Sequence, residues 1–211
     1  MRVTDNGIAI IEDFIPKGKK NRPGHANPCE YITIHETGNP AAGADAAAHA
    51  SYLRSDAAAG DYVSWHYTVD DTSIYQHLPD TESAYHAGDG GNGPGNRTSI
   101  GIEICVNAGG DFEKAKKNAA SLVRLLRSEH DIPLENVVQH NHWSGKNCPQ
   151  TLRESGKWPV FKAMCIDDGA SSWAKASWEK AVKKGIFDGT DPRGTLTREQ
   201  AAVVLDRLGL L

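Results

Sequence analysis

The sequence lacks long apolar runs, has only four cysteines in 211 residues, and shows no excess of positive charge. A membrane-spanning helix needs about 20 consecutive apolar residues, and no segment here approaches that length. The first residues, MRVTDNGIAI, also lack the basic start and the apolar stretch of a secretory signal peptide. We therefore expect no membrane insertion and no secretory leader.

The low cysteine number and the charge balance exclude two further classes. Four scattered cysteines are too few for a disulfide-stapled scaffold, so we expect Cys29, Cys105 and Cys165 to be reduced, buried thiols. A net charge of −4 argues against a nucleic-acid binder that works by bulk positive charge. The remaining composition, 39% hydrophobic and 24% charged, is typical of a soluble globular protein.

Histidine, by contrast, is plentiful, with nine copies. It is the commonest metal ligand and the side chain that titrates near neutral pH. Two segments with a period of two, 31–35 and 99–105, predict half-buried strands. Each would bury isoleucines on one face and present a titratable residue on the other, His35 in the first strand and Glu103 in the second.

Other segments complete the predicted fold. Further strands are expected at 62–69, 73–77 and 137–140, helices at 44–55 and 114–129, and a glycine-rich loop at 88–96. The intermixed periodicities predict an α/β (mixed α+β) fold with a central mixed β-sheet flanked by helices, plus a small C-terminal helical domain.

Ligand spacing points to a metal site. His140 and Cys148 lie eight residues apart in HNHWSGKNC, a segment predicted to be a loop that lets an imidazole and a thiolate converge. His35, at the end of a central strand, could supply a third ligand. Two histidines, one cysteine and a water make a tetrahedral zinc site with an open position, which is the catalytic pattern.

Simpler interpretations exist for the same residues. A histidine at a strand end is most often hydrogen-bonded, and a lone cysteine is most often a small buried hydrophobe. The sequence has no H-E-x-x-H, since Asn39 stands where the second histidine would be. The glycine-rich segment 88–96 has no GxxxxGK[ST], so a cleft-edge loop is favoured over a phosphate-binding loop.

Six motifs together resemble the zinc-dependent N-acetylmuramoyl-L-alanine amidases of the type-2 amidase family, which are related to peptidoglycan-recognition proteins. The chain is similar to endolysins and autolysins of Bacillus-like bacteria and their phages, over residues 7–160. The motifs are KNRPG (20–24), YITIHETGN (31–39), WHYTVDD (65–71), YHAGDG (85–90), NRTSIGIEIC (96–105) and HNHWSGKNCP (140–149).

The resemblance implies particular roles for these residues. His35, His140 and Cys148 match the zinc ligands, Glu103 the general base, and Lys146 the lysine near the developing oxyanion. Two further residues are implied as substrate contacts at the cleft, His86 and Trp65, the latter where some relatives carry a tyrosine.

The other histidines are assigned to supporting roles. We expect His66 to be structural, and His142 and Trp143 to support the ligands, since a metal-bound imidazole usually donates its other N–H to a partner. The remaining histidines, assigned to surface or packing, are His25, His49, His77 and His130.

The implied activity is peptidoglycan hydrolysis at the amide bond between N-acetylmuramic acid and L-alanine of the stem peptide, by zinc-activated water. The substrate would be the glycan strand with its stem peptide, and the outcome cell-wall lysis. Two alternatives remain: a non-catalytic peptidoglycan receptor, and a zinc peptidase acting within the stem peptide. Without a leader, the chain fits an endolysin made in the host cytoplasm and acting on the wall after release; an exported extracellular autolysin is the alternative.

The expected organisation is a catalytic domain at 1–166, a linker at 167–171 and a helical domain at 172–211. The last segment resembles one S-layer homology motif, which implies binding to a secondary cell-wall polymer. Dimerisation through Trp173, Trp178 and the leucines is the main alternative. The apolar stripes of the two predicted helices are Trp173, Ala174, Trp178, Ala181 and Val182, then Ala201, Val204, Leu205 and Leu208. Gly185 is predicted to end its first helix, and TREQ at 197–200 to cap its second.

Overall fold

The structure is a computed structural model that describes residues 1–166, 169–170, 174–187 and 196–211. It divides into two compact units, Met1–Ile166 and Asp167–Leu211. No helix among the described residues is both long and apolar enough to cross a membrane.

The first unit is built on a six-stranded mixed sheet in the order β1-β4-β3-β5-β2-β6. All neighbours pair in parallel except β3 and β4, which are antiparallel. This confirms the predicted mixed sheet flanked by helices. The strands are β1 (Ile10–Glu12), β2 (Tyr31–Glu36), β3 (Tyr67–Val69), β4 (Ile74–Gln76), β5 (Ser99–Ile104) and β6 (Val137–Gln139).

The two central strands, β2 and β5, are buried on both faces, so the prediction of half-buried strands was wrong. Their isoleucines pack in the main core. On the opposite face, Thr33 is fully buried and lies 2.8 Å from the hydroxyl of Ser99 and 2.8 Å from the indole nitrogen of Trp143. Parallel strands are commonly covered on both faces, and here short helices and loops cover the polar face.

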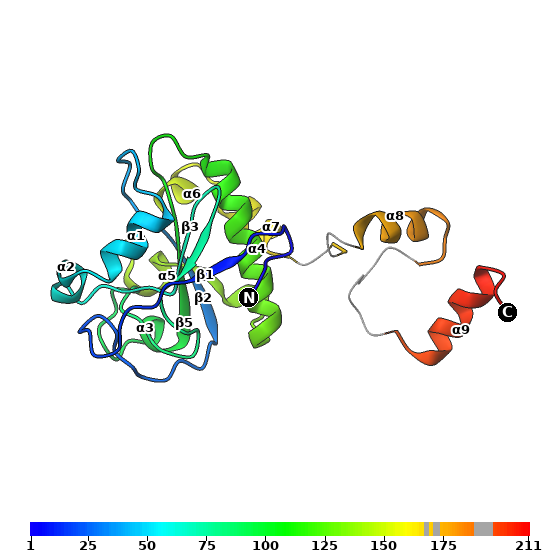
Figure 1. The fold of residues 1–211 in the computed structure, drawn as a ribbon, viewed down its shortest axis with the longest axis horizontal. Helices are drawn as coiled ribbons and strands as arrows, with labels where there is room; N and C mark the ends of the chain where they lie inside the picture. The colour runs from blue at the N-terminus through cyan, green and yellow to red at the C-terminus, as the bar shows by residue number, and fades with distance from the viewer. Residues whose placement is uncertain (167–168, 171–173, 188–195) are drawn as a thin grey trace. The chain divides into compact units, whose positions relative to one another are not determined.

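Helix α4 (Phe112–His130) covers the isoleucine face, as its apolar stripe predicts. Asp111 caps its start by accepting a bond from the Lys114 amide, and Asp131 ends it in the left-handed conformation, with φ of 53°. Helix α7 (Trp158–Met164) packs beside α4 (Figure 1). It adds the buried ring of Phe161 to the same core.

Four local predictions need correction. The helix expected at 44–55 is α1 (Ala46–Leu53), because Ser55 caps a separate helix, α2 (Asp56–Gly60). The strand expected at 62–69 begins only at Tyr67, since Tyr62 adopts a left-handed φ of 53° that interrupts extended backbone.

The other two corrections concern predicted loops. The glycine-rich segment 88–96 leads into α3 (Pro94–Thr98), where proline occupies the first turn as helices allow. The segment 140–148 contains α5 (Asn141–Ser144), a single turn that Gly145 ends at φ of 74°. A further short helix, α6 (Gln150–Glu154), follows Cys148.

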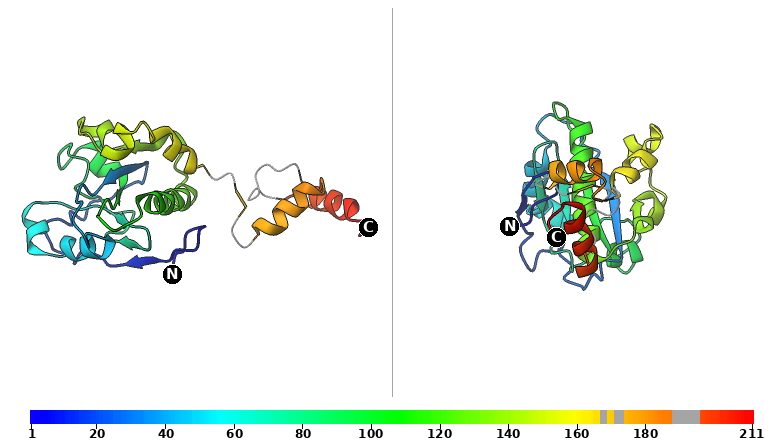
Figure 2. Two further views of the ribbon diagram at one scale, coloured as in Figure 1. Left: turned by 90° about the horizontal axis from the view of Figure 1, so that it is seen from above. Right: turned by 90° about the vertical axis from the view of Figure 1, so that its right-hand side faces the viewer.

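Strand β1 lies at the edge of the sheet beside β4 (Figure 2), and the sequence analysis missed it. The strand has three residues, and only Ile10 of them is buried. A segment this short with one buried residue shows no alternating pattern in the sequence.

The second unit contains α8 (Lys175–Lys183) and α9 (Arg198–Arg207). The capping box of Thr197 and Gln200 is present, and Gly185 follows α8 with φ of 68°, both as predicted. The Arg207 guanidinium donates to the carbonyls of Gly185 and Ile186, at 3.2 and 3.0 Å. No described residue of either helix is buried. Trp173 and residues 167, 168 and 171 of the expected linker lie outside the described residues.

Replacing Asp131 with glycine should stabilise the first unit. A left-handed conformation costs most L-residues about 1 to 2 kcal/mol, less for aspartate, and glycine is the preferred residue just past a helix end. We expect Asp131→Gly to raise the free energy of unfolding by about 0.5 to 1 kcal/mol, measured by urea unfolding. Asp131→Ala is the control and should lower it; equal or lower stability of the glycine variant would contradict this account of the α4 terminus.

Candidate metal centre and active-site cleft

Three parallel strands bring the predicted site residues to one edge of the sheet. His35 lies near the end of β2, directly opposite Glu103 on β5 in the strand register. His140 follows β6 at once, and its amide donates to the carbonyl of Ile34 at 3.1 Å. Cys148 is brought back by the turn of α5, because the Asn141 amide donates to the Cys148 carbonyl at 3.1 Å. Ligand sites in α/β sheets commonly form at these carboxyl ends.

The side chains of His35, His140 and Cys148 converge on one point. The two Nδ1 atoms are 2.9 Å apart, and Cys148 Sγ lies 4.0 Å from His35 Nδ1. All three residues are at most 5% exposed, and their donor atoms lie within 4.8 Å of one another. A tetrahedral ion with metal–nitrogen bonds of about 2.0 Å and a metal–sulfur bond of about 2.3 Å holds its donors about 3.3 to 3.6 Å apart. This donor set therefore fits a transition-metal ion.

The electrostatics of His35 and Cys148 also suit a cation. Burial, and then the neighbouring imidazoles of His86 and His140, lower the pKa of His35 well below its usual value, which leaves it neutral and able to ligate. Burial, helped by Glu103, raises the pKa of the Cys148 thiol to about 12. A thiolate at this position therefore needs a positive partner, and a bound metal ion supplies one.

Glu103 lies beside the candidate ligand atoms, with Oε1 3.8 Å from His35 Nδ1. Its Oε2 is buried and has no hydrogen-bond partner among the residues that the structure describes. Burial raises the pKa of this carboxyl to about 8, against the opposing effect of Lys146, and Glu36 adds to the rise. A carboxyl of this kind in a cleft is suited to accept and return a proton.

A cleft of about 690 Å³ opens onto this point. Glu103, Lys146, Trp65 and His86 all line it, so the structure brings the predicted catalytic and substrate-contact residues to one cavity. The Lys146 side chain is exposed, whereas Trp65 is 7% exposed and its indole donates to the hydroxyl of Thr68 at 2.7 Å.

Sequence reasoning missed two tyrosines that line the same cleft, Tyr62 and Tyr85. Their rings meet edge to face, with centroids 6.3 Å apart. Tyr85 immediately precedes His86 in the YHAGDG motif, which was the available indication. No sequence pattern indicated that Tyr62 lines the cleft. Its position depends on a turn at Tyr62 itself, and the alternating pattern of the segment had predicted a strand there.

The structure reassigns the support of His35. His35 Nε2 lies 3.0 Å from His86 Nδ1, so the neighbouring imidazole comes from a distant segment rather than from His142 or Trp143. The Trp143 indole instead donates to Thr33, and the His142 ring packs against Tyr31 and Trp143.

The remaining histidines behave as expected for packing and surface positions. His66 is fully buried, accepts a bond from the Gly101 amide at 2.9 Å and lies 2.8 Å from the Glu82 carbonyl. His77 Nε2 lies 2.8 Å from the Thr68 hydroxyl, and His49 Nδ1 lies 2.7 Å from the carbonyl oxygen of Asp45. His130 pairs with Asp80, and His25 is exposed. All four cysteines are buried and free.

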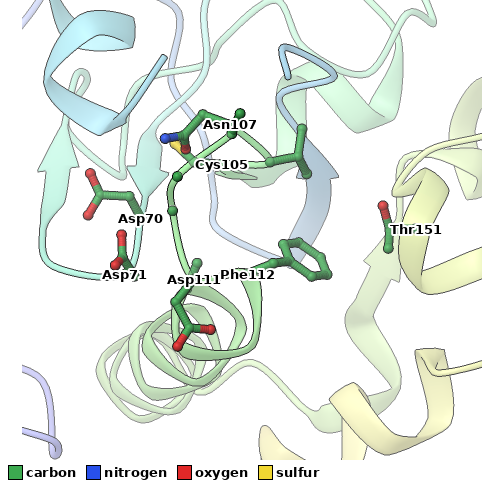
Figure 3. A pocket seen from close by; sticks show the side chains of 12 residues that line it. Asp70, Asp71, Cys105, Asn107, Asp111, Phe112 and Thr151 are labelled. Atoms are coloured by element: carbon green, nitrogen blue, oxygen red, sulfur yellow. The ribbon is translucent and has the colours of Figure 1, made fainter. Parts of the chain in front are cut away.

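Two other polar clusters do not resemble active sites. A cavity of about 310 Å³ lies where α4 begins, with Asp70 and Asp71 on one side and Thr151 on the other (Figure 3). The Asp70 carboxylate already accepts bonds from Ala46, Thr72 and Ser73. Elsewhere Asp80, Glu129 and His130 lie together, but the Arg2 guanidinium pairs with both carboxylates.

The chain is similar to a family of known proteins. A family model described as N-acetylmuramoyl-L-alanine amidase matches residues 25–151. The N-acetylmuramoyl-L-alanine amidase XlyA of Bacillus subtilis (strain 168) is 58% identical over 166 residues, covering 79% of this chain and 54% of that protein. The amidase CwlH of the same organism is 56% identical over 145 residues, covering 69% of this chain and 57% of that protein.

Solved structures show the same fold. The catalytic domain of XlyA matches with a TM-score of 0.71 at 57% identity, covering 75% of this chain and 100% of that one. The structure of PlyL matches with a TM-score of 0.70 at 36% identity, covering 77% and 100%. The chain spans about half the length of the curated relatives it matches.

The fold and the site together define an α/β domain with a candidate metal centre at the carboxyl ends of parallel strands. The chain belongs to the N-acetylmuramoyl-L-alanine amidase family.

Removing the thiol of Cys148 should weaken metal binding. Loss of an outer-shell partner of a ligand costs about 10- to 100-fold in metal affinity. Cys148→Ala removes a ligand itself, so we expect it to lower the affinity for a divalent transition metal at least 10-fold. Metal content after dialysis, measured by elemental analysis, checks this. Cys105→Ala is the matched control, since Cys105 is a buried thiol outside the cluster, and it should retain the metal. Equal metal content in the two variants would contradict the site.

Proposed function

We propose that this chain is a zinc-dependent peptidoglycan hydrolase that cleaves the amide bond between N-acetylmuramic acid and L-alanine of the stem peptide. The observation that carries the proposal is the convergence of His35, His140 and Cys148 beside the buried carboxyl of Glu103 at the floor of a cleft. Membership of the amidase family, and the activity named for XlyA and CwlH, support the bond and the substrate.

Zinc is the metal that this donor set favours. Two imidazoles and one thiolate leave one tetrahedral position for water, as in catalytic zinc sites. When bound there, zinc would lower the pKa of that water and polarise the scissile carbonyl.

The chain's own residues would then handle the protons and the developing charge. Glu103 would take the proton of the attacking water and deliver it to the leaving nitrogen. Lys146, at the rim of the same cleft, would stabilise the negative charge that grows on the carbonyl oxygen. Trp65 and His86 would form part of the wall against which the sugar and peptide lie.

The two alternative functions fit the site less well. A receptor that only binds peptidoglycan has no need of a buried carboxyl next to a three-residue ligand set. A zinc peptidase acting within the stem peptide would share the chemistry and differ only in the bond that is cut, so the products decide between them.

Mass spectrometry of digested cell walls tests the proposal. Wild-type protein should release intact stem peptides that begin with L-alanine; shortened peptides would indicate the peptidase, and no release the receptor.

Glu103→Gln should retain bound zinc and lose about 10²- to 10⁴-fold in rate, the usual contribution of general acid–base catalysis. A Glu103→Gln variant with wild-type turnover would rule out this carboxyl as the base.

We further propose that the second unit, residues 172–211, is an S-layer-homology-like module that attaches the catalytic unit to a secondary cell-wall polymer. Its two described helices have no buried residue, and Leu205 and Leu208 are at least 40% exposed, so the unit has apolar surface to offer a partner. The same surface would also allow a homodimer. The proposed setting is a phage or prophage endolysin released onto the wall, with an extracellular autolysin as the alternative.

Deleting residues 168–211 separates attachment from dimerisation. The catalytic domain of XlyA has been solved alone and matches 75% of this chain, so the shortened protein should fold. We expect it to lose binding to purified cell walls, measured by cosedimentation, and to keep the same number of chains per particle in solution as the full-length protein, measured by light scattering. Unchanged wall binding together with a fall from two chains per particle to one would instead favour the dimer.

A further inference from the structure

We propose that His86 is a positioning residue that holds His35 in a single tautomer, with the proton on Nε2 and the lone pair of Nδ1 directed at the metal. The inference rests on the metal site proposed above. His35 and His86 are 1% and 8% exposed, and His35 Nε2 lies 3.0 Å from His86 Nδ1. One of these two nitrogens must donate and the other accept, so the question is which of them carries the proton.

A backbone carbonyl decides the direction of the whole hydrogen-bond chain. The hydroxyl of Ser99 lies 2.6 Å from the carbonyl oxygen of Gly95. A carbonyl can only accept, and a hydroxyl has one proton to give. Ser99 therefore donates its proton to the Gly95 carbonyl, and its hydroxyl oxygen can only accept hydrogen bonds from its other neighbours.

His86 is one of those neighbours, with Nε2 3.4 Å from the Ser99 oxygen. Because Ser99 only accepts, His86 Nε2 must carry the proton. The His86 ring is 8% exposed, and the described partners of its two nitrogens, His35 and Ser99, carry no negative charge to balance an imidazolium, so this imidazole is neutral and has no second proton. Its Nδ1 is then a lone pair, and His35 Nε2 must donate to it. The remaining nitrogen of His35, Nδ1, is left as a lone pair facing His140 and Cys148.

A second branch of the chain obeys the same direction. The hydroxyl of Thr33 lies 2.8 Å from Ser99 and so donates to it. Thr33 in turn accepts from the Trp143 indole at 2.8 Å, which is a donor only. No contact in either branch places two donors or two acceptors against each other, so the arrangement has one consistent set of proton positions.

The position of the His86 ring depends on a glycine. A Cβ added to Gly101 on β5 would lie 2.8 Å from His86 Cγ, closer than side-chain carbons approach. The glycine between the buried isoleucines of β5 therefore gives the His86 ring room to lie against the strand. The orientation of His35 thus depends on residues from β2, β5 and the segment before α3.

Two isosteric variants of the full-length chain test which ring nitrogen matters. An asparagine amide can place its oxygen where His86 Nδ1 lies, keeping the acceptor for His35, whereas a glutamine reaches towards the Nε2 position and Ser99. We expect His86→Asn to bind zinc within a few-fold of wild type and His86→Gln to bind about 10- to 100-fold more weakly, the usual cost of losing a partner of a ligating histidine. The measurement is chelator competition with zinc alone. Wild-type affinity in both variants, or equal loss in both, would overturn the proposal.

A spectroscopic measurement on the unmutated chain does not depend on whether the variants fold. Long-range ¹H–¹⁵N correlation of the imidazole rings in the zinc-free protein should show the Nε2–H tautomer for both His35 and His86. An Nδ1–H tautomer at either ring would overturn the proposal. Neither experiment uses peptidoglycan, so a failure of the proposed amidase activity would leave both outcomes readable. A wild-type chain that binds no zinc would refute the metal site, while the tautomers would still test the hydrogen-bond chain.

Discussion

The parallel pairing of β2 with β5 is the constraint on which the candidate site depends. It sets His35 opposite Glu103, and the pairing of β2 with β6 brings His140 to the same edge. A shift of one residue in either register would turn the polar side chains into the isoleucine core. The packing of those isoleucines against α4 therefore stabilises the fold and fixes the geometry of the site at the same time.

Burial on both faces of the sheet gives the site its chemistry. An imidazole, a thiol and a carboxyl are all removed from water at one point, and each has a shifted pKa for that reason. Unpaired polar groups are costly in such surroundings. The fold compensates behind His35 with a hydrogen-bond chain that runs through His86 and Ser99 to the Gly95 carbonyl. Among the described residues of the site, Glu103 Oε2 and His140 Nε2 stay buried without a partner.

Much of the fold and of the site could be predicted from the sequence because the relevant patterns are local. The alternation in β2 and β5, the apolar stripe of α4 and the Thr197 capping box each depend on neighbouring residues. The eight-residue spacing of His140 and Cys148 likewise indicated a ligand pair, and motif resemblance added Glu103 and Lys146. The errors arose where a local pattern was ambiguous: Tyr62 continues an alternating segment but turns away in a left-handed conformation.

The sequence by itself determined the fold class, the family resemblance and the identity of the candidate ligands, since periodicity and motif residues specify all three. Only the tertiary structure decided which side chain supports His35. His86 lies 51 positions further along the chain and reaches His35 because β5 carries a glycine beneath its ring. The tertiary structure also decided that the polar face of the sheet is buried. Both facts depend on segments that meet only when the strands pair, and such contacts leave no periodic trace in the sequence.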